Sequence, residues 1–319
     1  MRGVILFLGN ATMLTRVALL LADADIDFTA IDVLHEYVSF IGTFCIVGAA
    51  AFYFLLLRPA LSNGSPAMVV ASRAAARIGI LGGVLRLLSI LMSVNGAMNE
   101  KHLTFVEALT RRPAVLVGTA VTVIAILAFA AAAFAASGAL LSWTIAGIAT
   151  LVIALRGVIT TELEELVNPV HVFAASMWIG TLFVLVVAGL STLLSGAVPP
   201  NERDPAIASM VNRFTTIALW STGVLVLTGL TTAWLHLGSI PALWTSIYGR
   251  TLMVKLCLVA VVFWLGGYNN LRMKPAMGTE DGARRLKRSA TFEIGVAAIV
   301  LIVTAVLVNL PAPAEHMAH

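Results

Sequence analysis

Long apolar segments recur along the whole sequence, and they limit the fold more than any motif does. A helix needs roughly 20 apolar residues to cross about 30 Å of hydrocarbon. Backbone N–H and C=O groups have no water to bind inside lipid, so such segments must be helices and not open strands. The eight expected spans are 33–57, 75–97, 114–136, 139–156, 168–194, 214–236, 251–272 and 289–310.

The composition agrees with a membrane protein. Hydrophobic residues make up 60% of the 319 residues and charged residues only 11%, and the mean hydropathy is +0.98, far from the values of soluble domains. Residues 114–155 are too long for one span, and Ser137-Gly138 divides them into a helical hairpin. We therefore predict an all-α fold, a polytopic transmembrane helical bundle of eight spans that contacts membrane lipid.

One membrane domain, residues 29–311, is expected to occupy most of the chain, with a short segment at each end. Within residues 1–28, Gly3–Ala22 is apolar but is interrupted by Asn10 and Arg16. An uncleaved signal-anchor, a ninth span and an amphipathic surface helix all stay open for this segment. A cleavable signal peptide fits less well, because the apolar core after Arg16 is short. Residues 312–319 form a tail that contains histidine and methionine.

The distribution of basic residues predicts the orientation of the bundle. A pI of 9.4 is compatible with nucleic-acid binding, but the lysines and arginines concentrate in alternate loops, as the positive-inside rule requires. Acidic residues cluster before the first span and between the fourth and fifth, so both ends of the bundle are expected outside and no nucleic-acid partner is expected. The loop after the second span, with Lys101, Arg111 and Arg112, fits this pattern less well. The basic residues expected inside are Arg58, Arg73, Arg77, Arg272, Lys274, Arg284, Arg285, Lys287 and Arg288.

Histidine and methionine side chains provide the candidate metal chemistry. His35 lies near the outer end of the first span and His171 near that of the fifth, and all six histidines face outward in the predicted topology. Imidazole and thioether groups suit copper, and Cu(I) is favoured as the thioether content rises. The alternatives are interfacial histidines bonded to a neighbouring helix and methionines that only pack. The candidate metal ligands are His35, His171, Met177, Met92, Met98, His316 and His319.

Four polar residues inside the expected spans need partners or a role. Arg86 lies near the middle of the second span, where an arginine costs about 2.5–3.5 kcal/mol on insertion scales. Glu293 is its expected partner because both lie in the inner half; an arginine that snorkels to the inner interface is the alternative. Lys255, near the outer end of the seventh span, is expected to bind headgroups or an acid of the outer loops. Asn269 and Glu293 are expected to serve metal exit or packing near the inner end.

The stretch 212–275 carries a set of features that resembles the CopD/PcoD copper-resistance membrane domain. The set is specific although no single piece is, and the resemblance extends over about 30–310. The chain departs from the family at Arg156-Gly157-Val158, where relatives often have Gly-His-Ala. The matching features are Arg213-Phe214, Thr228-Gly229-Leu230, Trp234, Leu237-Gly238-Ser239, Tyr248-Gly249-Arg250, Lys255, Asn269, Pro275 and Glu293, with His171 and Trp178-Ile179-Gly180 in the fifth span and His35 in the first.

This resemblance implies copper resistance or homeostasis at the bacterial inner membrane. Copper, as Cu(I) or Cu(II), is then the bound ion, and a periplasmic copper-binding protein is an expected partner. We expect copper ion transport or reception and not an enzyme, since the sequence has no hydrolase triad, phosphate loop, nucleotide motif or CxxC. Two alternatives stay open: a b-type haem protein in which His35 and His171 hold one haem, and a non-transporting scaffold for a periplasmic copper protein. Oligomeric state, coupling ion and direction of movement stay open as well.

Overall fold

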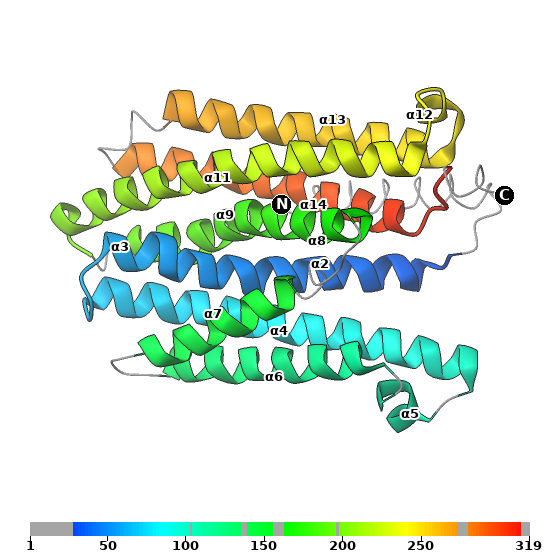
Figure 1. Ribbon diagram of the computed structural model, residues 1–319. Helices are drawn as coiled ribbons and strands as arrows, with labels where there is room; N and C mark the ends of the chain where they lie inside the picture. The colour runs from blue at the N-terminus through cyan, green and yellow to red at the C-terminus, as the bar shows by residue number, and fades with distance from the viewer. Residues whose placement is uncertain are drawn as a thin grey trace, which may run out of the picture.

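The structure is a computed structural model in which the described elements are all helices. The long helices run side by side as one bundle (Figure 1). Short π-helical turns, labelled η, interrupt several of them. The residues described are 28–102, 104–110, 112–134, 139–155, 163–195, 198–273 and 280–313. The elements are α2 (Ala30–Ala51), η1 (Phe52–Leu57), α3 (Arg58–Ala60), α4 (Pro66–Lys101), α5 (Phe105–Thr110), α6 (Pro113–Phe134), α7 (Leu140–Leu155), α8 (Leu163–Ala175), η3 (Ser176–Gly180), α9 (Thr181–Val184), η4 (Leu185–Leu190), α10 (Ser191–Leu193), α11 (Pro200–Leu237), α12 (Ala242–Thr245), α13 (Ile247–Tyr268), η5 (Asn269–Met273) and α14 (Glu280–Val308).

Seven helices of the described chain are long and apolar enough to cross a membrane, which confirms the all-α polytopic prediction. The fourth predicted span, 139–156, corresponds to α7, a shorter apolar helix of 16 residues. The N-terminal segment that was a candidate ninth span lies outside the described residues. The seven helices are Ala30–Ala60, Pro66–Asn99, Pro113–Phe134, Leu166–Leu193, Pro200–Leu237, Ile247–Leu271 and Glu280–Val308.

Three helices begin well before the predicted spans, and this corrects the expected loops. Helix α4 begins at Pro66, α11 at Pro200 and α14 at Glu280. At α4 the Ser65 Oγ accepts a hydrogen bond from the Met68 backbone N at 3.2 Å, and a proline suits the first position of a helix because its missing N–H needs no partner there. Six of the basic residues expected in inner loops therefore lie inside helices, near their N-termini: Arg73 and Arg77 on α4, and Arg284, Arg285, Lys287 and Arg288 on α14.

The N-terminal parts of α4, α11 and α14 gather at one end of the bundle, together with α3 (Figure 1). The positive-inside rule makes this the inner end. The first turns of α11 and α14 are joined there: the buried Arg203 contacts Asp204 and Glu280, each at 2.8 Å, and Arg284 contacts Glu280 at 2.7 Å. The outer end, opposite, holds the start of α2, the end of α11, α12 and the end of α14.

Glycines set the close contact between α2 and the π-helical turn η3. A Cβ atom built on Gly48 would overlap the backbone of Gly180, and one on Gly180 would overlap the carbonyl of Phe44. Helix association in lipid depends on such close packing of small residues, since lipid tails are as apolar as the side chains. The two helices are parallel, so this contact also fixes which residues of each lie at the same depth.

Aromatic stacking holds the short helix α7 against α2 and its π-helical continuation. Trp143 of α7 is fully buried, and its ring stacks on Tyr53 with centroids 4.0 Å apart and packs edge-on against Phe129 at 5.6 Å. Such ring–ring contacts stabilise a buried aromatic residue in addition to the stabilisation that comes from burial of its apolar surface. The first half of the chain therefore forms a tightly packed wall, and the candidate site lies in the second half.

Candidate functional site

Two cavities of about 260 Å³ each follow one another along α11 and α13. The outer cavity is lined by His171, Gly229 and Lys255 among many apolar residues. The inner cavity is lined by Glu293 and Asn269, again among apolar residues. Helices α2, α8, η3 and α14 complete the wall of the outer cavity, and η3, α9, η4, η5 and α14 complete that of the inner cavity. The two cavities are therefore membrane-embedded pockets, each with a few polar groups.

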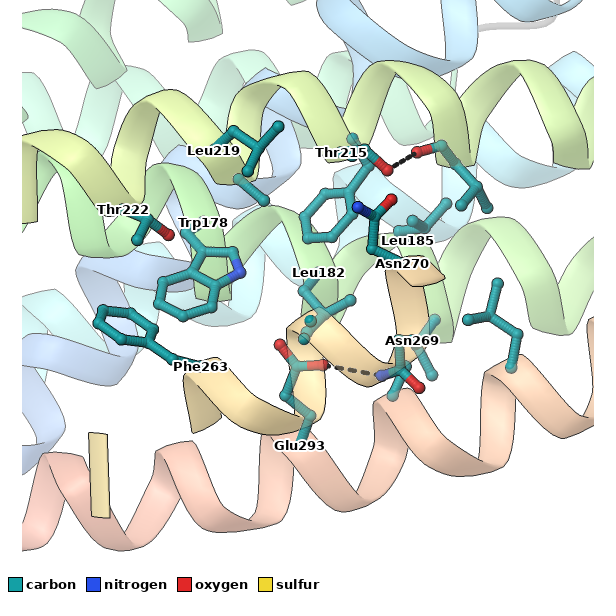
Figure 2. Close-up of a pocket in the computed structure, with 18 of the residues that line it drawn as sticks. Trp178, Leu182, Leu185, Thr215, Leu219, Thr222, Phe263, Asn269, Asn270 and Glu293 are labelled. Carbon is teal, nitrogen blue, oxygen red and sulfur yellow. Dashed lines mark hydrogen bonds between the residues drawn. The ribbon is translucent and has the colours of Figure 1, made fainter. Parts of the chain in front are cut away.

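Trp178 and Phe263 line both cavities and lie between them. Their rings are 5.2 Å apart at 27°, close to a stacked arrangement. Trp178 is buried and comes from η3, whereas Phe263 comes from α13. Figure 2 shows the two rings at one end of the inner cavity, with Glu293 and Asn269 further along. We call these two residues the aromatic pair.

His171, which lines the outer cavity, is held by Thr228 of α11. Its Nδ1 atom lies 2.9 Å from the Thr228 Oγ1 atom, and that hydroxyl donates its own hydrogen to the Val224 carbonyl at 2.7 Å. A hydroxyl has one hydrogen, so Thr228 accepts from His171, and the imidazole carries its proton on Nδ1. The Nε2 atom then keeps a free lone pair, the arrangement that a metal-binding histidine requires.

The residue after Thr228 gives the imidazole its room. A Cβ atom on Gly229 would lie 3.4 Å from Cε1 of His171, so the glycine leaves the ring in close contact with the backbone of α11. The Thr228-Gly229 dipeptide therefore orients the ring through one residue and accommodates it through the next. The sequence pointed to Thr228 only as part of the family resemblance and gave no reason to pair it with His171.

Lys255 lines the outer cavity together with His171 and is half-buried. It lies about two turns into α13, which begins at Ile247. The sequence placed it near the outer interface, as a residue that binds headgroups or an outer acid, whereas the structure directs it into the cavity. A lysine inside a span is costly and marks a functional position. Its positive charge also opposes a bare cation beside His171.

Glu293 and Asn269 form a buried polar pair in the inner cavity (Figure 2). Glu293 is 2% exposed and Asn269 is 8% exposed. The Asn269 Nδ2 atom donates to Glu293 Oε2 at 3.0 Å, while the Asn269 Oδ1 atom is buried and accepts no hydrogen bond from the described residues. Gly266 lies beside the other carboxylate oxygen, since a Cβ there would be 3.4 Å from Oε1.

The predicted pair between Arg86 and Glu293 is wrong. Arg86 donates from its NH1 atom to Thr43 Oγ1 at 2.8 Å, and Glu293 accepts from Asn269 instead. The reason is the arrangement of the helices: α2 contacts both α4 and α14, so the helix that carries Arg86 packs against α2 and not against α14. Equal depth in the membrane did not bring the two side chains together.

The other predicted ligands lie away from His171. His35 is not among the described residues that line the outer cavity, and its Nδ1 atom lies 3.4 Å from its own neighbour Glu36. Gly180 contacts both Phe44 and Gly48, so His171, nine residues before it, lies at the depth of residues 35–39 of α2, and similar depth does not bring His35 into the cavity. Met92 and Met98 are half-buried on α4, and Met177 is half-buried in η3; the described cavity linings contain none of them. His316 and His319 lie outside the described residues.

Closed metal centres are absent from the part of the chain that the structure describes. No group of three or more His, Cys, Asp or Glu side chains converges there. Cys45 is buried and Cys257 is exposed, and both are free thiols. The outer cavity therefore offers a single oriented imidazole and not a complete ligand shell.

Comparisons with known proteins point to the half of the molecule that builds these cavities. Residues 208–307 match the family model described as copper resistance protein D. The predicted resemblance to the CopD family is confirmed over these residues. This CopD region contains Thr228, Lys255, Asn269 and Glu293, whereas His171 and Trp178 reach the cavities from outside it. The chain is a multi-pass protein of the inner membrane.

A curated relative also carries a copper-related name. The copper transport protein CutJ of Bacillus subtilis (strain 168) is 33% identical over 151 residues, which make up 47% of this chain and 26% of the relative. The chain thus matches about a quarter of that protein's length. No solved structure matches this chain.

Proposed function

We propose that this protein receives copper at the outer face of the inner membrane and passes it through the bundle, with His171 as the receiving ligand. The observation that carries the proposal is the lone pair of His171 Nε2, which Thr228 orients beside a cavity inside a span. Imidazole nitrogen suits copper in both of its oxidation states. The CopD match and the name of the Bacillus relative supply the choice of copper.

The two cavities supply a route for the ion. Copper enters the outer cavity, binds at His171, passes the aromatic pair and reaches the inner cavity beside Glu293. The positive charge of Lys255 favours copper that arrives with an anionic ligand, or on a carrier, over a bare ion. A periplasmic copper-binding protein fits that requirement as the donor. His35, at the outer end of α2, and the histidines of the tail would then meet copper before His171 does.

Replacing His171 with alanine will abolish copper binding in the outer cavity without loss of folded protein. The ring is half-buried and is bonded through one nitrogen to Thr228. Its removal therefore affects the stability of the fold little but removes the copper ligand. Copper per mole of purified protein, measured by elemental analysis after removal of loosely held metal, checks the result. Unchanged stoichiometry in the variant contradicts the role of His171.

His236→Ala is the matched control for that experiment. His236 lies on the same helix as Thr228, its Nδ1 atom donates to the Thr232 carbonyl at 2.9 Å, and its ring stacks on Tyr248 at 5.7 Å, outside both cavities. Copper stoichiometry will therefore stay at the wild-type value. Copper uptake into liposomes separates a transporter from a scaffold, and a Soret band in the purified protein would support the haem alternative instead.

Replacing Lys255 with glutamine will raise the affinity of the outer cavity for copper. Like charges in one cavity repel by roughly 1–2 kcal/mol at an effective dielectric constant of about 20, which corresponds to a gain on the order of tenfold. A copper titration with a competing chelator measures the change. Lys287→Gln, a lysine at the inner end, is the control and will leave the affinity unchanged. A lower affinity for Lys255→Gln would show that the lysine holds an obligatory anionic ligand.

A further inference from the structure

Glu293 is a carboxyl group without a cationic partner among the residues that line its cavity. It lies inside a span, is 2% exposed, and is the one ionisable residue in the described lining of the inner cavity. A charge inside a membrane needs compensation from a partner or from bound ligand. Its hydrogen bond from Asn269 Nδ2 at 3.0 Å supplies a dipole but no charge. No cationic side chain of the described lining balances a charge on Glu293, which makes the cavity suited to a bound cation.

Five cationic side chains of the surrounding helices, among those that the structure describes, do not line the inner cavity. Lys255 lines the outer cavity, on the far side of the aromatic pair. Arg86 donates to Thr43 on α2. On α14 itself Lys287 and Arg288 precede Glu293 by more than one turn, and on α11 the exposed Arg213 precedes Phe214; none of the three lines the inner cavity.

The inner cavity also holds an acceptor that the fold leaves unused. The Asn269 Oδ1 atom is buried, in a residue that is 8% exposed, and it accepts no hydrogen bond from the described residues. A buried acceptor without a partner costs free energy, so its presence points to a ligand that it binds. Glu293 Oε1, which faces Gly266, and the polar side chains of Thr215 and Thr222 belong to the same cavity.

This set of oxygen atoms defines the kind of ligand. Carboxylate, amide and hydroxyl oxygens are hard donors that prefer hard cations, whereas Cu(I) prefers sulfur and imidazole nitrogen. One carboxylate balances one positive charge. The inner cavity therefore differs in chemistry from the outer cavity, where the donor is an imidazole.

We propose that the inner cavity is a monovalent-cation site in which Glu293 and Asn269 bind a sodium ion or a proton. With sodium, Glu293 Oε2 and Asn269 Oδ1 are ligands once the Asn269 amide turns over, because Oδ1 otherwise lies on the side of the amide that faces away from Glu293 (Figure 2). With a proton, the carboxylic acid donates to the Asn269 amide oxygen after that amide turns over. The proposal that a cation binds here depends only on the residues of the inner cavity. Its use to drive copper movement rests on the proposed function, since a cation bound beyond the aromatic pair is placed to exchange with copper that arrives from the outer cavity.

Thermal unfolding of the purified full-length protein in detergent tests the sodium arm. Sodium chloride, compared with choline chloride at equal ionic strength, will raise the unfolding midpoint by a few degrees with a saturable dependence, because a ligand that binds only the folded state stabilises it. The shift will disappear in Glu293→Gln and weaken in Asn269→Leu. Glu280→Gln, which alters a carboxylate at the inner end bonded to Arg203 and Arg284, will keep it.

Infrared spectroscopy tests the proton arm on the same samples. A protonated Glu293 gives a carboxylic-acid C=O band that titrates in the wild type, is absent in Glu293→Gln and is insensitive to sodium. If the wild-type protein shows neither a sodium-dependent shift nor such a band, the proposal is overturned. This outcome does not depend on the folding of any variant. Copper stoichiometry in Glu293→Gln, measured in parallel, will stay at the wild-type value, and His171→Ala will keep the cation response, so the two proposals fail separately.

Discussion

Alanine at Gly180 will prevent normal packing of the bundle. Its Cβ atom would overlap the Phe44 carbonyl, and a Cβ on Gly48 would overlap the backbone of Gly180. Backbone atoms cannot move aside by a rotamer change as the end of a flexible side chain can. Helix α2 and η3 must therefore separate over much of their length. Overpacking typically lowers the free energy of unfolding by 1–3 kcal/mol and occasionally by more. We expect a loss of about 3 kcal/mol or more for Gly180→Ala and for Gly48→Ala. Folded yield after size-exclusion chromatography and the thermal unfolding midpoint measure it.

Two other glycines provide the matched control. A Cβ atom on Gly96 of α4 or Gly223 of α11 would meet nothing within 4 Å. Alanine has a higher helix propensity than glycine by up to about 1 kcal/mol, so both substitutions will be neutral or slightly stabilising. If Gly180→Ala unfolds at the same temperature as Gly223→Ala, the close contact between α2 and η3 does not exist as described.

The same contact bears on the candidate site. The contact between Gly48 and Gly180 sets the depth of η3 against α2, and η3 carries Trp178 and follows directly on the helix that holds His171. The folded fraction of the Gly180→Ala protein will therefore bind less copper per molecule than the wild-type protein does. A substitution that only lowers the yield would leave copper per folded molecule unchanged.

Helix type followed from the sequence because lipid leaves the backbone few choices. A long apolar run must be a helix, so seven predicted spans reappear as helices. The ends of the helices did not follow, since apolar content stops at the membrane surface while hydrogen bonding continues. The cap at Ser65 and the charged N-terminal part of α14 extend helices into water, and hydropathy carries no signal for them.

Side-chain partners were harder to predict than helices. The sequence gave Arg86 and Glu293 similar depth, but depth along a helix does not say which neighbour a side chain faces. Arg86 faces α2, where Thr43 accepts its hydrogen bond, and Glu293 faces η5, where Asn269 donates to it. Which helices are neighbours is decided by packing over the whole bundle, at glycines such as Gly48, and a single sequence does not reveal it.

The candidate site was predicted only in part. His171 was singled out as a histidine at the mouth of a span, and the structure places it at a cavity with an oriented ring. Its orienting residue Thr228 is 57 positions away, and the only sequence signal for Thr228 was its place in the family motif. The aromatic pair was missed because Trp178 entered only as part of the family resemblance, and because nothing in the sequence relates it to Phe263.

Replacing Trp178 with alanine will join the two cavities and raise the rate of copper entry into liposomes on the order of tenfold. The indole is the larger half of the aromatic pair that separates them, and a tenfold rate requires a barrier lower by only about 1.4 kcal/mol. Copper uptake, followed by a chelating dye inside the vesicles, measures the rate. Copper stoichiometry at His171 will not change, since Trp178 is not a ligand.

As a control, Trp264→Ala removes an indole of the same size from the same region without changing the aromatic pair. Trp264 stacks on Tyr268 at 6.0 Å and is 67% exposed towards the lipid, and it lines neither cavity in the described chain. Its uptake rate will match the wild type, so any general loosening of the membrane domain by loss of an indole is accounted for. Equal rates for Trp178→Ala and Trp264→Ala would mean that copper does not pass between the cavities, and the route through the aromatic pair would have to be abandoned even if His171 still binds the ion.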